Sequence, residues 1–109
     1  MPRSPYIIAL STFANKRQAQ KISKKLVQEG LVACVNIVDN IHSIYRWKTK
    51  IVSEKEVLVI IKTIKSNKQR LKKFILNNHS YDNPELVFIS IDDGVGDLIK
   101  QEEVKFPEK

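Results

Sequence analysis

The stretch Ala33–Ile64, ACVNIVDNIHSIYRWKTKIVSEKEVLVIIKTI, decides the fold because it predicts one long β-hairpin. The polar residues Lys48–Lys50 mark its tip. Each arm then holds about 13–16 residues, which is roughly 43–53 Å of strand. A compact chain of this length has a diameter of only about 34 Å. The hairpin must therefore either bend sharply or project beyond its own domain.

The two arms of the hairpin differ in pattern. Asp39–Asn40 interrupts the first arm and predicts a bulge or bend. The second arm starts at Ile51 and contains the apolar run Val57–Ile61, which is typical of a strand buried on both faces. A break at Asp39–Asn40 would let the strand fold back, but we expect projection into a symmetric oligomer, because proteins seldom leave an apolar face uncovered. The apolar positions of the first arm share one parity and predict one apolar face: Ala33, Val35, Ile37, Ile41, Tyr45 and Trp47.

The flanking segments predict two strands and three helices. Asn15 can cap the first helix and Gly30 can end it, while Ser66 with Gln69 has the spacing of a capping box. The order β-α-β-β-α-β, followed by a short helix, predicts an α+β, ferredoxin-like fold in a single domain over residues 1–109. The expected elements are a strand over Tyr6–Thr12, a helix over Lys16–Glu29, a helix over Asn67–Asn78, a strand over Glu85–Asp92 and, capped by Asp97, a short helix over Leu98–Val104.

Composition limits the classes of protein that fit. The 109 residues suffice for one ordinary domain, and no apolar run approaches the roughly 20 residues of a membrane span. The single cysteine excludes an internal disulfide and fits a reducing compartment. The chain becomes polar at Ser11–Thr12, too early for a signal peptide, so we expect a cytoplasmic protein. The net charge of +7 fits either an anionic partner such as nucleic acid or lysines scattered along the chain by a biased codon pool.

Four separated motifs, in order along the chain, resemble the CutA family of divalent-cation tolerance proteins. They are ACVNI at Ala33–Ile37, SIYRWKTKI at Ser43–Ile51, Glu54-x-Glu56 followed by IKT at Ile61–Thr63, and HSYDNPE at His79–Glu85. The resemblance runs from about Tyr6 to the final helix. It implies a PII-like homotrimer whose hairpins pair between subunits. It also implies a non-enzymatic role in tolerance of divalent metals, with copper bound by some members and no cofactor required.

The sequence departs from the family pattern at several positions. Lys48 and Thr49 stand where the hairpin tip often has an acidic residue and usually a glycine, and Ser80 stands in place of the usual proline. Some metal-binding members place a cysteine near Ser11 and a second histidine at Asn78. We therefore expect copper or another divalent cation to bind only weakly, with His79 as the metal ligand.

The expected ligand-binding residues are Tyr45, Trp47, Lys62, His79, Tyr81 and Glu85. The resemblance implies that a trimer brings the hairpin aromatics of one subunit to a cleft of its neighbour. Tyr45 and Trp47 fit interface packing equally well. His79 also fits a helix C-terminal residue that interacts with the last carbonyls.

Two further side chains restrict the chemistry. Lys62 follows a buried run, so it must extend to solvent, pair with Glu54, Glu56 or Glu85, or meet an anionic ligand. Cys34 and His42 share a strand parity but lie about 26 Å apart along the strand, too far to share a metal ion within one subunit unless the strand folds back.

Other functional classes remain as alternatives. A small anionic ligand in the subunit clefts would make the protein a PII-like sensor. An RNA-binding module has the same order of elements, but it needs aromatic residues on its two central strands, where Val, Leu and Ile stand here. No nucleophile motif or phosphate-binding loop supports catalysis. We therefore expect no enzyme and no membrane association, and nucleic acid is the least favoured of the partners considered.

Overall fold

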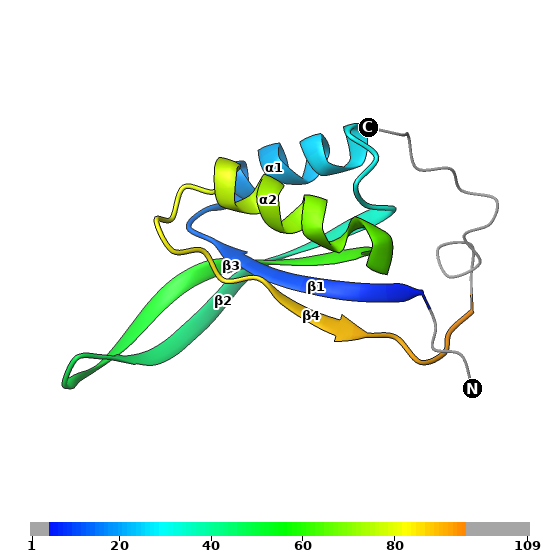
Figure 1. Ribbon diagram of the computed structural model, residues 1–109. Helices are drawn as coiled ribbons and strands as arrows, with labels where there is room; N and C mark the ends of the chain where they lie inside the picture. Colours follow the sequence, from blue (N-terminus) through cyan, green and yellow to red (C-terminus); the bar gives the residue numbers. More distant parts are fainter. Residues whose placement is uncertain (1–4, 96–109) are drawn as a thin grey trace.

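The computed structural model describes residues 5–95, in which two helices cover one face of a four-stranded antiparallel sheet (Figure 1). The strand order β2-β3-β1-β4 is that of the predicted ferredoxin-like α+β fold. The expected short helix over Leu98–Val104 and its cap Asp97 lie outside the described residues. The elements are β1 (Tyr6–Phe13), α1 (Lys16–Gln28), β2 (Cys34–Trp47), β3 (Lys50–Ile64), a 3₁₀ turn (Lys65–Asn67), α2 (Lys68–Asn78) and β4 (Val87–Ser90).

The core lies between the sheet and the helices because side chains alternate along β1 and β3. Phe13 of β1 and Ile61 of β3 are fully buried against Leu26 of α1 and Leu71 of α2. The run Val57–Ile61 was expected to be buried on both faces, and this is wrong for a single subunit. Its alternate residues are only half-buried, because no helix within residues 5–95 covers the other side of the sheet.

The predicted cap of α1 is present in the structure, whereas the predicted capping box of α2 is not. The side chain of Asn15 accepts a hydrogen bond of 2.9 Å from the Gln18 amide and caps α1, and Gly30 takes a positive φ of 71° after it. The capping box predicted at Ser66 is not formed, because the chain enters α2 through a 3₁₀ turn that already contains Ser66. Asn67 is buried there and donates hydrogen bonds to the backbone oxygen of Leu31 and the hydroxyl of Thr63.

The last described strand is shorter than predicted. β4 begins at Val87 rather than Glu85, because the backbone oxygen of Glu85 accepts a hydrogen bond from the Ser11 hydroxyl at 2.7 Å instead of joining the ladder. Val87 and Ile89 of this strand are exposed on the side of the sheet that α1 and α2 do not cover.

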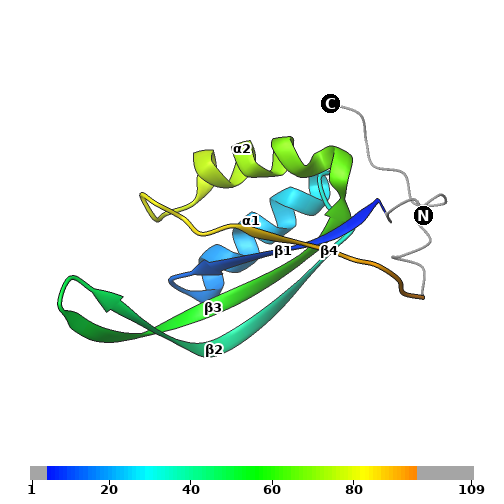
Figure 2. The same cartoon turned by 60° about the horizontal axis from the view of Figure 1, so that its bottom comes forward.

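The predicted projection of the hairpin is confirmed. Within β3, only residues 57–64 pair with β1. Residues 50–56 therefore pair with β2 alone and form a two-stranded arm. The arm extends away from the helices and the rest of the sheet, and the longest dimension of the molecule is 47 Å (Figures 1 and 2). A two-residue turn at Lys48–Thr49 closes it, with Lys48 at a positive φ of 57°.

The predicted bulge at Asp39–Asn40 is also confirmed, and it overturns the prediction of one apolar face. Val38 pairs with Leu58 and Ile41 with Glu56, so β2 uses one residue more than β3 across the bulge. Residues of equal parity before and after the bulge therefore point to opposite faces. Val35 and Ile37 face the helices, whereas Ile41, Tyr45 and Trp47 share the face of Glu56, which the helices leave uncovered.

We call the side of the sheet opposite the helices the open face. Half-buried or exposed apolar side chains occupy it along all four strands. It carries Ile8, Leu10, Val38, Leu58, Ile60, Val87 and Ile89. No helix within residues 5–95 is long and apolar enough to cross a membrane.

Candidate functional site

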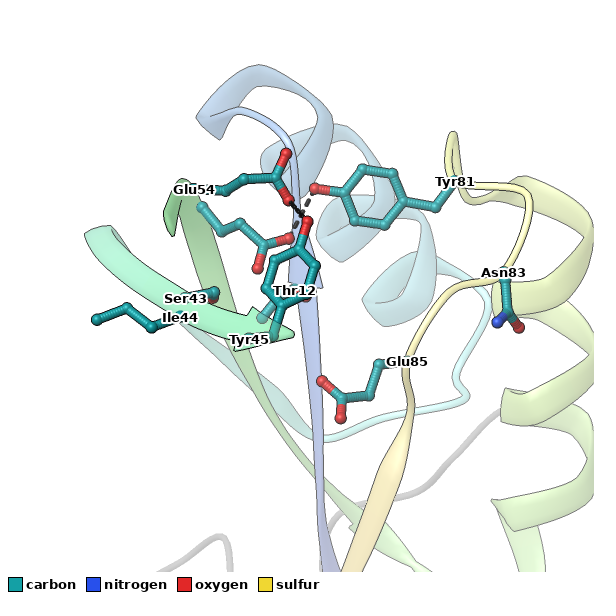
Figure 3. A pocket seen from close by; sticks show the side chains of 9 residues that line it. Thr12, Ser43, Ile44, Tyr45, Glu54, Tyr81, Asn83 and Glu85 are labelled. Carbon is teal, nitrogen blue, oxygen red and sulfur yellow. Dashed lines mark hydrogen bonds between the residues drawn. The ribbon is translucent and has the colours of Figure 1, made fainter. Parts of the chain in front are cut away.

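A cleft of about 730 Å³ opens at the base of the arm, where β2 and β3 pass the end of β1 (Figure 3). The connector between α2 and β4 forms its other wall. Three segments that are distant in the sequence, namely the end of β1, the hairpin and the connector, therefore meet at this cleft. Its lining residues are Thr12, Ser43, Ile44, Tyr45, Glu54, Glu56, Tyr81, Asn83 and Glu85.

Two tyrosine–glutamate hydrogen bonds cross the cleft. Glu54 and Glu56 lie two residues apart on β3 and so point to the same face. The Tyr81 hydroxyl donates to Glu56 Oε2 at 2.7 Å, and the Tyr45 hydroxyl donates to Glu54 Oε1 (Figure 3). The first bond joins the connector to the hairpin, while the second joins the two strands of the arm.

Both phenols keep their protons at neutral pH. Burial is the main cause that raises the pKa of Tyr81, and its hydrogen bond to Glu56 adds to the effect. The hydrogen bond to Glu54 is the main cause that raises the pKa of Tyr45. Each tyrosine therefore acts as a donor to a carboxylate, and neither supplies a phenolate for nucleophilic chemistry.

His79 lies directly behind Tyr81 and holds the connector in place. Its Nε2 lies 2.7 Å from the backbone oxygen of Thr12, and its Nδ1 lies 3.0 Å from the backbone nitrogen of Tyr81. Since a carbonyl can only accept, Nε2 carries the proton and Nδ1 accepts the amide hydrogen, which makes the ring neutral. The ring also stacks on Phe13, with centroids 4.1 Å apart.

Burial lowers the pKa of His79, although the Thr12 carbonyl and Glu56 oppose this effect. Neither ring nitrogen has a free lone pair in this arrangement. The metal role of His79 thus stays a prediction, and it requires the bond between Nδ1 and the Tyr81 amide to break.

The structure brings together some of the predicted ligand-binding residues and separates others. Tyr45, Tyr81 and Glu85 line the cleft, and Glu85 extends its carboxylate toward it (Figure 3). His79 supports the cleft from behind. Lys62 and Trp47 do not line it within the subunit.

Lys62 pairs with Cys34 across the strands, at the opposite end of the sheet from the arm. It stands six residues from Glu56 along β3, or about 20 Å, and Glu54 lies two residues further away. Lys62 pairs with Ile8, whose partner Ile89 stands four residues from Glu85, or about 13 Å of extended chain. The strand positions therefore separate Lys62 from the three carboxylates suggested as its partners. Trp47 lies beside the hairpin tip and is exposed.

The sequence did not identify several lining residues. Thr12 lies outside the four motifs, and Ser43 and Asn83 lie inside two of them without indicating a ligand-binding role. Glu54 and Glu56 belong to one of the four motifs and are predicted as partners of Lys62, but not as ligand-binding residues, although their alternate spacing on a strand indicates two carboxylates on one face.

The charge of the cleft favours a cationic ligand over an anion. Three carboxylates line it, and none of its lining residues is a lysine, arginine or histidine. Yet no three His, Cys, Asp or Glu side chains within residues 5–95 converge closely enough to hold a metal ion. Cys34 and His42 lie on opposite faces, because the bulge between them reverses the parity that they share in sequence.

Comparison with known proteins gives a consistent result. Residues 7–100 match the sequence model of the CutA1 divalent ion tolerance protein family. The chain is 41% identical to the chloroplastic protein CutA of Arabidopsis thaliana over 90 residues, which is 83% of this chain and 50% of that protein. It thus spans about half the length of the plant proteins it matches. It is 39% identical to the divalent-cation tolerance protein CutA of Thermus thermophilus over 80% of this chain and 84% of that protein.

Solved structures agree in fold. The divalent cation tolerance protein of Thermus thermophilus superposes with a TM-score of 0.79 at 38% identity, covering 83% of this chain and 87% of that one. CutA1 from Oryza sativa superposes with a TM-score of 0.83 at 34% identity, covering 91% of this chain and 94% of that one.

Proposed function

Since this chain belongs to the CutA1 divalent ion tolerance protein family, we propose that it binds divalent cations as a homotrimer. The family is one of non-catalytic tolerance proteins, so binding is the activity to be explained. The single observation that carries the proposal is the acidic cleft at the base of the arm, which has three carboxylates and no basic side chain in its lining.

The arm supports the homotrimer. Tyr45 and Trp47 lie on one of its faces, Ile44 and Ile51 lie on the other, and all four are exposed. An isolated two-stranded hairpin is at best marginally stable in water, and it presents unpaired strand edges. Pairing of the hairpin strands with neighbouring subunits would cover these edges, and the open face of the sheet would supply further apolar contact.

The trimer also supplies a reason for the incomplete cation site. One subunit offers carboxylates but too few convergent ligands, so a neighbouring subunit would complete the coordination. Carboxylate oxygens suit hard divalent cations, whereas copper favours imidazole and thiolate. His79 is already engaged on both nitrogens, and Cys34 lies outside the cleft. We therefore expect copper to bind weakly.

A small anion is a less favoured ligand for the same cleft. It would need basic side chains from a neighbour, such as Lys62, to offset the three carboxylates. This sensor function is therefore secondary to cation binding.

Light scattering and calorimetric titration test the proposal together. The mass should be that of three chains at micromolar concentration. Manganese and copper should each give binding heats that disappear in the double variant Glu54→Gln, Glu56→Gln. The matched control is Asp92→Asn, Asp93→Asn, which removes two exposed carboxylates outside the cleft and should leave binding unchanged. A monomer, or equal binding by both double variants, would contradict the proposal.

The role of His79 has its own test. Unchanged copper affinity in His79→Ala would remove it as a ligand.

The proposed compartment is the cytoplasm, supported by the single free cysteine. Cell fractionation of the full chain measures it directly.

A further inference from the structure

Basic side chains gather on the helical side of the molecule. Ten of the 19 Lys and Arg residues of the chain lie within residues 16–29 and 65–78, where Glu29 is the only acidic residue. The charge also fits lysines scattered along the chain, but in the fold both of these segments lie on the same side of the sheet (Figures 1 and 2). The acidic cleft, in contrast, lies at the base of the arm.

The cations of α1 form an ordered row. Arg17, Lys21 and Lys25 follow at intervals of four residues, so they stand on one side of the helix about one turn apart, or roughly 5.4 Å per turn. Ala19, Ile22 and Leu26 hold the opposite side against the sheet. We define the basic helical face by its exposed cations: Arg17, Lys21, Lys24 and Lys25 of α1, with Lys72 and Lys73 of α2.

This arrangement opposes the stability of the helices themselves. Like charges at spacings of three or four residues repel, and α1 itself contains no acidic residue, while Glu29 follows directly after its last residue. Both helices also begin with cations, at the end where the helix dipole favours anions, and neither has an acidic residue in its first turn. Folding therefore does not explain the row, whereas a polyanionic partner would.

We propose that the basic helical face binds the phosphate backbone of nucleic acid without reading its sequence. Lysines at one-turn intervals provide point charges for phosphates, and exposed Gln20 and Gln28 add neutral donors. The surface differs from that of an RNA-binding sheet and needs no aromatic platform. A membrane is a poorer partner, because a helix that binds lipid inserts its apolar side, and α1 buries that side on the sheet.

This surface does not depend on the proposed cation site. It also stays accessible in the proposed homotrimer, which would use the open face and the arm for association. Three copies of the face on one particle would then bind a long polyanion with avidity.

Salt-dependent binding of a fluorescent duplex, as DNA and as RNA, tests the proposal on the full chain. With about four phosphate contacts, the logarithm of the association constant should fall with the logarithm of salt at a slope of roughly −3.6 for DNA. Anisotropy measured from about 50 to 200 mM salt gives this slope. Unrelated duplex sequences should bind equally.

Two triple variants with the same change in net charge separate the surface from overall charge. Arg17→Gln, Lys21→Gln, Lys25→Gln should weaken binding by about tenfold or more and make the slope shallower by roughly 2.7. Lys48→Gln, Lys50→Gln, Lys55→Gln alters only exposed residues of the arm. It should leave binding nearly unchanged, with light scattering showing the same mass as the wild type. Circular dichroism should show that both variants keep the fold.

Three results would overturn the proposal. They are no binding at the lowest salt, equal losses in the two triple variants, and tighter binding to vesicles that contain phosphatidylserine than to the duplex.

Discussion

Tyr81 donates a hydrogen bond of 2.7 Å from its hydroxyl to the carboxylate of Glu56, and this contact ties the connector after α2 to the base of the hairpin. The two residues lie 25 positions apart. The acceptor is ionised at neutral pH, so the bond is charge-assisted and stronger than one between neutral groups. The hydrogen bond holds the connector against the hairpin. It therefore fixes the position of the cleft wall that the connector forms.

Removing this hydroxyl should weaken the fold measurably. We expect Tyr81→Phe to lower the free energy of unfolding by about 1 kcal/mol, since the bond is only partly buried. Urea denaturation at a fixed chain concentration measures this, because the stability of an oligomer depends on concentration. The control is Tyr45→Phe, whose bond to Glu54 is exposed in the arm and should contribute little. Equal losses in both variants would contradict the assignment.

The neutral state of His79 predicts a pH dependence of stability. Burial lowers its pKa in the folded protein below the ordinary value of 6.5, so the unfolded chain takes up a proton first as the pH falls. Stability should therefore be complete above about pH 6.5 and decrease as the pH falls toward the folded pKa, below which the loss is constant. Denaturation curves between about pH 7.5 and 5 measure this change.

Substitution isolates this histidine from other titrating groups. His79→Phe keeps a ring against Phe13 but cannot titrate, so its stability should vary less with pH than that of the wild type. The matched control is His42→Asn, which replaces the other histidine of the chain at an exposed position on the arm. A parallel pH response in His79→Phe and the wild type would refute the role assigned to His79.

Local patterns predicted the order of the elements, because apolar residues recur every 2 positions in a strand and about every 3.6 in a helix. Ala19, Ile22 and Leu26 are an example in α1. They could not predict the cleft. His79 meets Thr12 across 67 positions, and no local pattern encodes such a contact. The prediction that Ala33 to Trp47 share one apolar face was wrong for a related reason. Faces were assigned from odd and even positions, and the extra residue in the bulge reverses that assignment after Asn40.

The exposed apolar residues of the arm should be needed for assembly. Ile51→Lys introduces a charge into the surface that we assign to the homotrimer, and a buried unpaired charge strongly disfavours association. We expect this variant to shift toward smaller species in light scattering at micromolar concentration. Leu76→Lys is the matched control, because Leu76 on α2 is 65% exposed, against 64% for Ile51, but lies outside the arm. Assembly that tolerates Ile51→Lys, or that fails equally in both variants, would exclude the arm as the interface.

The bulge should depend on the identity of Asn40. Asn40 has a φ of 59°, and its backbone N–H donates a hydrogen bond of 2.8 Å to Asp39 Oδ1. Asparagine and glycine tolerate this left-handed backbone, whereas a β-branched residue does not. We expect Asn40→Val to lower the free energy of unfolding by about 1–2 kcal/mol and Asn40→Gly to change it far less.

Asn40→Val and Asn40→Gly also show whether the bulge affects only the backbone at Asn40 or also the position of Tyr45 in the cleft. The bulge sets Ile41 opposite Glu56. Every second residue after Ile41, including Tyr45, therefore lies on the face of the carboxylates. If Asn40→Val forces a regular ladder or a different register, the Tyr45 bond to Glu54 should be lost, and the phenol should titrate closer to its ordinary pKa of 10.0, because that bond is the main cause of its raised pKa. Spectroscopic titration of the tyrosines in both variants measures this shift. A wild-type titration in Asn40→Val would mean that the register of the arm is held by its other cross-strand pairs and not by the bulge.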